Sequence, residues 1–127
     1  RGRPKAPLDL LDHECIGFRF SRGAALYRWE LERAGREETV AISGRLTCND
    51  SSMMVRAAVA GLGLAYLAEP EAAPYVARGQ LELVLEDYAP RVPGIFLYFP
   101  RGAERQPKLR AFIDTARRVL RPPGKRR

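Results

Sequence analysis

The chain has 127 residues, of which 46% are hydrophobic, which is enough to bury the core of one domain or slightly more. It has no apolar run long enough to cross a membrane, no secretory signal pattern and no initial Met, so we expect a cytoplasmic fragment of a longer protein, without a membrane partner. The net charge of +7 does not indicate a nucleic-acid-binding fold, because the excess lies in residues 101–127, with ten basic and two acidic side chains.

The first predicted elements are a helical turn in residues 7–13 and a strand over residues 14–20 (ECIGFRF). Gly17 marks a point in this strand where another backbone or a ligand comes close. Cys15 and Cys48 fall on separate predicted strands. Because the chain lacks a signal segment, we expect both to be buried, reduced thiols.

Residues 26–32 (LYRWELE) alternate cleanly between apolar and polar side chains. Tyr27, Trp29 and Leu31 point one way, which is typical of a strand with one buried and one wet face. A turn at residues 34–36 and a returning strand at 38–42 complete an antiparallel hairpin.

The central stretch, residues 45–69, reads as strand, helix and strand. Residues 45–48 form the first strand and residues 64–67 the second, with Gly61 ending the helix between them. One of four polar residues caps the start of the helix: Asn49, Asp50, Ser51 or Ser52. The predicted buried stripe of the helix is Met53, Met54, Ala57 and Ala58.

This unit predicts a right-handed crossover between parallel strands, with the helix N-terminus at the carboxyl edge of the sheet. Open α/β sheets bind ligands at that edge, and the helix dipole favours an anion there. The polar residues at 49–52 therefore suit a small polar ligand, although the alternative that they only cap the helix stays open.

The rest of the chain is predicted as two helices and two strands. A helix begins at Glu69 and closes at Gly79, with Pro74 shortening its regular part. Strands follow at residues 81–85 and 95–99, separated by a connector at 86–94 that is the best candidate for a domain boundary. The last helix spans residues 107–120, with an apolar stripe made of Leu109, Phe112, Ile113, Ala116 and Leu120.

Several segments, in this order, resemble the effector-binding domain of LysR-type transcriptional regulators. They are PLDLLDHECIGFRF, GRLTCNDSSMM, AAVAGLGLAYLAEPE, ARGQLELVLEDY, GIFLYFP and LRAFID, and together they cover most of residues 4–120. The most specific parts are the Asn49-Asp50 entry to the helix, Gly61-Leu62-Gly63, and the closing strand and helix.

The resemblance implies an α/β, periplasmic-binding-protein-like (type 2) lobe, with a mixed, mainly parallel sheet flanked by helices. By this analogy, residues 1–88 form the second lobe, 89–93 a hinge or connector, and 94–120 the strand and helix that return to the first lobe. Residues 121–127 are a basic tail, which we expect to be disordered, although weak non-specific contact with nucleic acid stays open.

The resemblance also implies a small effector, anionic or aromatic, held in a cleft between the lobes. The residues that would face it are Phe18, Arg19, Asn49, Asp50, Ser51 and Ser52. Phe18 suits stacking and Arg19 suits a carboxylate, although a core role for Phe18 and a plain surface role for Arg19 stay open. The implied partners are further copies of the chain, as a dimer or tetramer of the full protein.

The family's winged helix-turn-helix is absent from this sequence, so any DNA contact would belong to a missing N-terminal segment. Most of the first lobe is also absent. We therefore expect the apolar residues 94–120 to dock onto a second copy or to pack in a position that the family does not use.

Other classes find less support in the sequence. A stand-alone periplasmic-type binding protein is the alternative, but it would need an export signal. We predict no enzyme and no cofactor, because no catalytic constellation, phosphate loop or complete dinucleotide fingerprint occurs. His13, Cys15 and Cys48 lack the paired spacing of a zinc site.

Overall fold

The structure is a computed structural model that describes residues 1–21, 23–91 and 96–120. It divides into two compact units, residues 1–91 and residues 92–127, and each is described by itself. The first unit contains the strands β1 (Cys15–Phe18), β2 (Trp29–Arg33), β3 (Arg36–Val40), β4 (Thr47–Cys48) and β5 (Leu64–Ala65). Its helices are the 3-10 helices η1 (Pro7–Asp12) and η2 (Glu86–Tyr88) and the α-helices α1 (Ser51–Val59) and α2 (Glu69–Ala77).

A three-stranded parallel sheet forms the centre of the first unit. Its strand order is β4-β1-β5, so β1 lies between the two strands that α1 connects. The prediction of parallel strands joined by a helix is therefore confirmed. All three strands are shorter than predicted.

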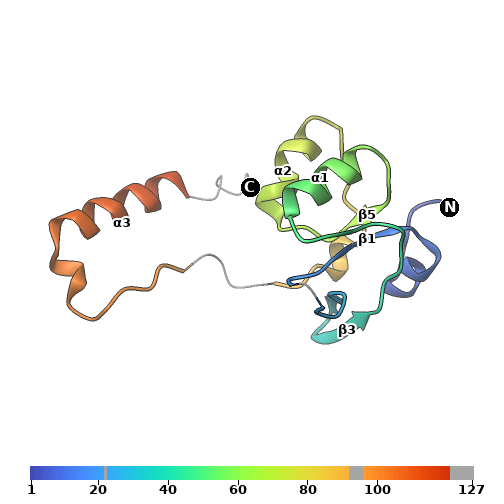
Figure 1. The fold of residues 1–127 in the computed structure, drawn as a ribbon, viewed down its shortest axis with the longest axis horizontal. Helices are drawn as coiled ribbons and strands as arrows, with labels where there is room; N and C mark the ends of the chain where they lie inside the picture. The colour runs from blue at the N-terminus through green and yellow to red at the C-terminus, as the bar shows by residue number, and fades with distance from the viewer. Residues whose placement is uncertain (22, 92–95, 121–127) are drawn as a thin grey trace. The chain divides into compact units, whose positions relative to one another are not determined.

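The central strand is apolar throughout because both of its faces are covered. Cys15 packs into a core cluster with side chains of the hairpin, while Ile16 packs with Met54 of α1. Helices α1 and α2 lie together on one side of the sheet, and the hairpin lies on the other (Figure 1). A strand buried on both faces needs a continuous apolar run, which is what β1 supplies.

The boundaries of α1 follow from its terminal residues. The side chain of Asp50 accepts a hydrogen bond from the Met53 backbone N–H at 2.9 Å and caps the helix. At the other end, Gly61 has a φ of 75°, and the Leu62 N–H donates to the Ala57 carbonyl at 3.0 Å. This is the hydrogen bond of a Schellman motif, so the predicted stop at Gly61 is confirmed.

The predicted buried stripe of α1 is wrong at one position. Met54 and Ala57 are buried and Ala58 is half-buried, but the side chain of Met53 is 52% exposed. Val55 is buried in its place, because the helix turns residues 54, 55, 57 and 58 toward the sheet and toward α2.

The hairpin of β2 and β3 is confirmed as antiparallel, with Trp29 opposite Val40 and Leu31 opposite Glu38. Trp29 and Leu31 are buried, while Glu30 between them is exposed. The hairpin forms a sheet of its own and does not join β4-β1-β5, so the expected mixed sheet is instead two separate sheets.

Three other predicted features differ from the structure. Helix α2 continues regularly through Pro74, which does not shorten it. Residues 81–85 form no strand, and Leu85 takes a left-handed backbone conformation that ends extended structure. Residues 96–99 also form no strand, because no ladder partner lies beside them among the described residues; Ile95 and the predicted tail at 121–127 lie outside those residues.

In the second unit, the described residues contain the 3-10 helix η3 (Ala103–Arg105) and the helix α3 (Pro107–Val119). No residue from 96 to 120 is buried. Phe96, Tyr98 and Phe112 are all exposed, and the stripe of α3 is at most half-buried, at Leu109, Ile113 and Ala116. The amphipathic pattern of α3 is present, but the described residues provide no core for it.

Gly44 gives a direct test of the sheet packing. A Cβ placed on Gly44 would lie 1.9 Å from the Cys15 carbonyl oxygen, which cannot move without breaking β1. We expect Gly44→Ala to lower the free energy of unfolding by about 2 kcal/mol or more. In the control Gly17→Ala, the added Cβ meets a methyl group of the flexible Leu26 side chain, so the expected loss is about 1 kcal/mol or less. Equal losses in urea denaturation would contradict this account.

Candidate functional site

The candidate site lies where β1 and β4 end side by side. The two parallel strands pair with Phe18 opposite Cys48, and the Arg19 backbone N–H donates to the Cys48 carbonyl at 2.9 Å. Arg19 and Asn49 are the next residues along the two strands. Their side chains are therefore brought to the same edge of the sheet, although they are thirty residues apart in the sequence.

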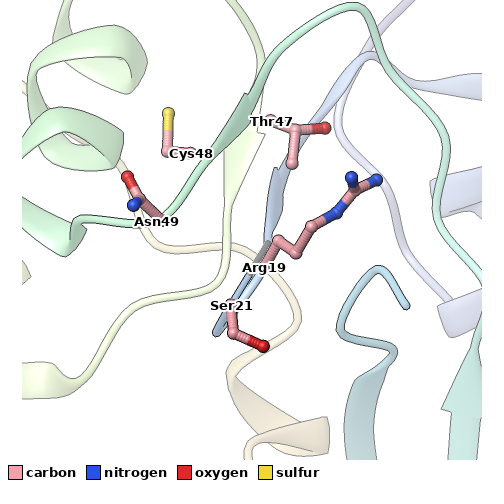
Figure 2. A pocket seen from close by; sticks show the side chains of 5 residues that line it. All are labelled: Arg19, Ser21, Thr47, Cys48 and Asn49. Atoms are coloured by element: carbon pink, nitrogen blue, oxygen red, sulfur yellow. The ribbon is translucent and has the colours of Figure 1, made fainter. Parts of the chain in front are cut away.

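A hollow of about 470 Å³ opens at this edge (Figure 2). It is lined by Arg19, Ser21, Thr47, Cys48 and Asn49. Figure 2 shows Arg19 at the end of one strand, Thr47 and Cys48 on the neighbouring strand, and Asn49 at the start of the loop into α1. The hollow is open to solvent.

Strand alternation separates the side chains of Thr47 and Cys48. Thr47 is exposed, whereas Cys48 is buried and packs with Ile16 and Met54. In Figure 2 the Cys48 sulfur points away from Arg19. Burial raises the pKa of the Cys48 thiol, so this group is a core side chain and not a reactive one.

The exposed side chains at the hollow supply several hydrogen-bond donors. Arg19 is exposed, and its guanidinium makes no ion pair or hydrogen bond with any residue that the structure describes. The hydroxyls of Ser21 and Thr47 and the amide of Asn49 add further donors. A carboxylate or another small anion fits this set, because a guanidinium fork binds it with two charge-assisted hydrogen bonds.

The polar side chains at the start of α1 are engaged within the protein. The Ser52 hydroxyl donates to the Asp50 carboxylate at 2.5 Å, and the Met53 N–H donates to the same oxygen at 2.9 Å. These two hydrogen bonds lower the pKa of Asp50. The Ser51 hydroxyl donates to the carboxylate of Glu71 and so connects α1 to the first turn of α2.

The six residues predicted to contact an effector occupy different environments. Arg19 and Asn49 line the hollow. Phe18 is half-buried against the core cluster of α1. Asp50 caps α1 and accepts from Ser52, while Ser51 donates to Glu71 of α2. Sequence reasoning missed Ser21 and Thr47, although both lie within two residues of a predicted strand end, the signal used to choose Arg19.

The structure groups no metal ligands in its described part: no three His, Cys, Asp or Glu side chains converge there. Cys15 is a free, buried thiol whose sulfur lies 3.6 Å from the Leu10 carbonyl oxygen, and burial raises its pKa to about 11. Among the described residues, no helix is long and apolar enough to span a membrane.

Residues 1–121 match the family model of the LysR substrate binding domain. The chain belongs to this family. The family model describes a substrate-binding domain, and relatives that match this chain are named as transcriptional regulators.

Curated relatives agree with this assignment. YagP of Escherichia coli K12, which carries the provisional name of a LysR family substrate binding domain-containing protein, is 43% identical over 80% of this chain and 75% of its own. A protein of Pseudomonas aeruginosa with the provisional name of transcriptional regulator is 42% identical over 96% of this chain. The HTH-type transcriptional regulator PgrR of E. coli K12 is 32% identical over 90% of it. The chain spans only 40% and 38% of the length of the last two.

Solved structures show the same fold. The regulatory domain of AphB from Vibrio vulnificus superimposes with a TM-score of 0.60 at 25% identity, over 69% of this chain and 43% of that one. The same domain treated with cumene hydroperoxide superimposes with a TM-score of 0.65 at 23% identity, over 88% of this chain and 54% of that one. The LysR substrate-binding domain described here is therefore an α/β lobe of the periplasmic-binding-protein-like type 2 fold, as the sequence predicted.

The cap of α1 makes a prediction about pH. Because the pKa of Asp50 is lowered in the folded state, its ionised form stabilises the fold above the pKa of the unfolded chain. That stability is lost as the pH falls through the lower, folded-state pKa. We expect Asp50→Asn, which keeps an acceptor but not the charge, to melt below wild type at pH 7, and we expect this difference to shrink as the pH falls.

Thermal unfolding between pH 2.5 and pH 7 measures this difference. The matched control is Asp12→Asn, because Asp12 is exposed and its carboxylate does not cap the start of a helix. A difference between wild type and Asp50→Asn that stays constant over the whole range would contradict a contribution from the ionised cap.

Proposed function

We propose that this domain binds a small anionic effector at the hollow beside Arg19 and acts as the effector-sensing part of a LysR-type regulator. The observation that carries the proposal is the position of an exposed guanidinium, without a protein partner among the described residues, at the carboxyl edge of a parallel sheet. This edge is the usual ligand position in open α/β folds.

The chemistry of the hollow favours a carboxylate. Arg19 supplies the charge, and Asn49 and Thr47 can fix the orientation of the bound group through their amide and hydroxyl. An aromatic part of the effector could stack on Phe18, whose ring is half-buried at the end of β1. The first turn of α1 adds the positive end of a helix dipole close to Asn49.

The domain organisation that we propose keeps residues 1–88 as the second lobe, 89–93 as the connector and 94–120 as the return to the first lobe. Two observations support it: the chain divides near residue 91, and residues 96–120 lack a core of their own. The opposite wall of the effector cleft would then come from polypeptide outside this chain.

In the complete regulator, effector binding would shift the balance between two arrangements of the lobes and so change the activity at DNA. DNA would be bound by a separate helix-turn-helix segment, and the protein would work in the cytoplasm as a dimer or tetramer. We propose no enzymatic reaction, since the relatives described above are named as regulators and substrate-binding proteins.

Removing Arg19 tests the binding proposal. A panel of small aliphatic and aromatic carboxylates is screened by thermal shift, because a ligand of the folded state raises the melting temperature. For a carboxylate that stabilises wild type, we expect Arg19→Ala to weaken binding by roughly 10- to 100-fold, the value of one charge-assisted contact. Asn49→Ala should weaken it less.

Arg36→Ala is the matched control, because Arg36 is an exposed arginine at the far end of the hairpin and does not line the hollow. A carboxylate that binds wild type and Arg19→Ala equally well would refute the proposed site. Weakening of equal size in Arg36→Ala would show that only the net charge matters.

The uncovered apolar residues predict self-association of the isolated chain. Phe96 is 63% exposed and Tyr98 is 88% exposed, next to an amphipathic helix without a buried face. We expect the mean mass from light scattering to rise with concentration and to fall toward the monomer in a Phe96→Lys/Tyr98→Lys double variant. Phe20→Lys, which changes an exposed aromatic side chain of the first unit, should have little effect. A concentration-independent monomer would contradict the expectation.

A further inference from the structure

We propose that Arg33 and Tyr88 form a clamp by which the β2-β3 hairpin fixes the start of the connector between the two units. In this view the hairpin is a part of the hinge and not only a cover for the sheet. Three features of the molecule support it: the contacts of the Arg33 guanidinium, the backbone conformation of Leu85 and the place of Tyr88 near the end of the first unit.

The first observation is a double contact between the two side chains. The Arg33 guanidinium donates a hydrogen bond to the Tyr88 hydroxyl at 2.7 Å, and its central carbon lies 4.9 Å from the centre of the Tyr88 ring. One arginine thus holds both the edge and the face of one aromatic side chain, which restricts the tyrosine more than a single hydrogen bond would.

The pairing within the hairpin explains why Arg33 is available for this contact. Arg33 stands directly opposite Arg36 in the ladder, and like charges in that arrangement repel each other. Arg33 makes no ion pair with the described part of the protein, so Tyr88 is its principal partner there. The electron-rich face of a tyrosine ring is a favourable environment for such a cation.

The second observation is the backbone at Leu85. This residue has φ 56° and ψ 34°, in the left-handed region that a leucine rarely adopts, and it directly precedes η2 (Glu86–Tyr88). Such a conformation persists only where the surroundings hold it. Here packing holds it, because the side chains of Leu85 and Tyr88 both pack against the core cluster that contains Trp29 and Leu31 of the hairpin.

The third observation is position. Tyr88 is the last residue of η2, and the first unit ends three residues later, at Arg91. The last residues of the first unit therefore follow a segment that is held by Leu85 against the core cluster and by Tyr88 against the hairpin. The hairpin is itself tied to the residue that follows β5, because the Tyr66 hydroxyl donates to the Glu30 carbonyl at 2.8 Å.

A regulatory meaning of the clamp rests on the proposed function. If effector binding changes the arrangement of two lobes, the connector needs a defined pivot, and hinges are formed by a few residues at the ends of elements. The clamp would supply this pivot at residues 85–88 and would make the position of the hairpin part of the response.

Hydrogen exchange of the chain without any ligand tests the clamp. The Tyr88 amide donates to the Leu85 carbonyl at 2.9 Å, and the Ala89 amide donates to the Glu86 carbonyl at 3.1 Å, so both amides report whether η2 is closed. We expect Arg33→Ala to speed their exchange by roughly three- to tenfold, the effect of losing an exposed cation–π contact and one hydrogen bond. Tyr88→Phe keeps the ring and should give a smaller increase.

Arg36→Ala is the matched control, because it removes the opposite arginine of the same pair without touching Tyr88. The amides of Ala57 and Ala58, inside α1 and on its buried side, report the stability of the first unit and should be unchanged in Arg33→Ala. The clamp is refuted if Arg36→Ala speeds exchange at Tyr88 and Ala89 as much as Arg33→Ala does, or if Arg33→Ala speeds exchange equally in α1. Because no ligand is present, either result leaves the effector proposal to its own test.

Discussion

The pairing of β1 between β4 and β5 is the interaction on which the rest of the first unit depends. It requires close backbone contacts on both sides: Gly44 lies against the Cys15 carbonyl, and Gly63 lies against the Glu14 carbonyl. Neither position has room for a Cβ. Because β1 is covered on both faces, it also joins the hairpin cluster to the cluster under α1.

The same pairing creates the candidate site. Parallel strands in register end together, and so Arg19 and Asn49 become neighbours at one edge. At this edge the polar residues fall into two groups. Asp50, Ser51 and Ser52 satisfy the start of α1 and connect it to α2, while Arg19, Ser21 and Thr47 face the hollow. The first group stabilises α1. The positive end of the α1 dipole then favours an anion beside the second group.

The two units differ in how far this chain can stabilise them. Residues 1–91 contain two core clusters, whereas residues 96–120 contain no buried side chain. An amphipathic helix of thirteen residues is not stable alone in water, since helical stability comes mainly from packing of the apolar face. Two of the relatives described above, the Pseudomonas aeruginosa protein and PgrR, are more than twice as long as this chain.

The sequence by itself determined the features that depend on neighbouring residues. The cap and stop of α1, the alternation of Trp29 and Leu31, and the apolar run of β1 were all predictable, because each reflects a local rule of backbone geometry or periodicity. The order of recognisable segments also indicated the family and its fold.

The tertiary structure decided what depends on distant partners. Val55 is buried in place of Met53 because the sheet and α2 lie on that side of α1. Residues 81–85 and 96–99 have the composition of strands, but they form no ladder with any described residue, and a strand exists only where another strand pairs with it. Likewise, the sequence indicated Arg19 as a possible ligand contact but indicated no such role for Thr47 or Arg33. Only the folded chain brings the first two to one hollow and the third to Tyr88, because such contacts join segments that are tens of residues apart.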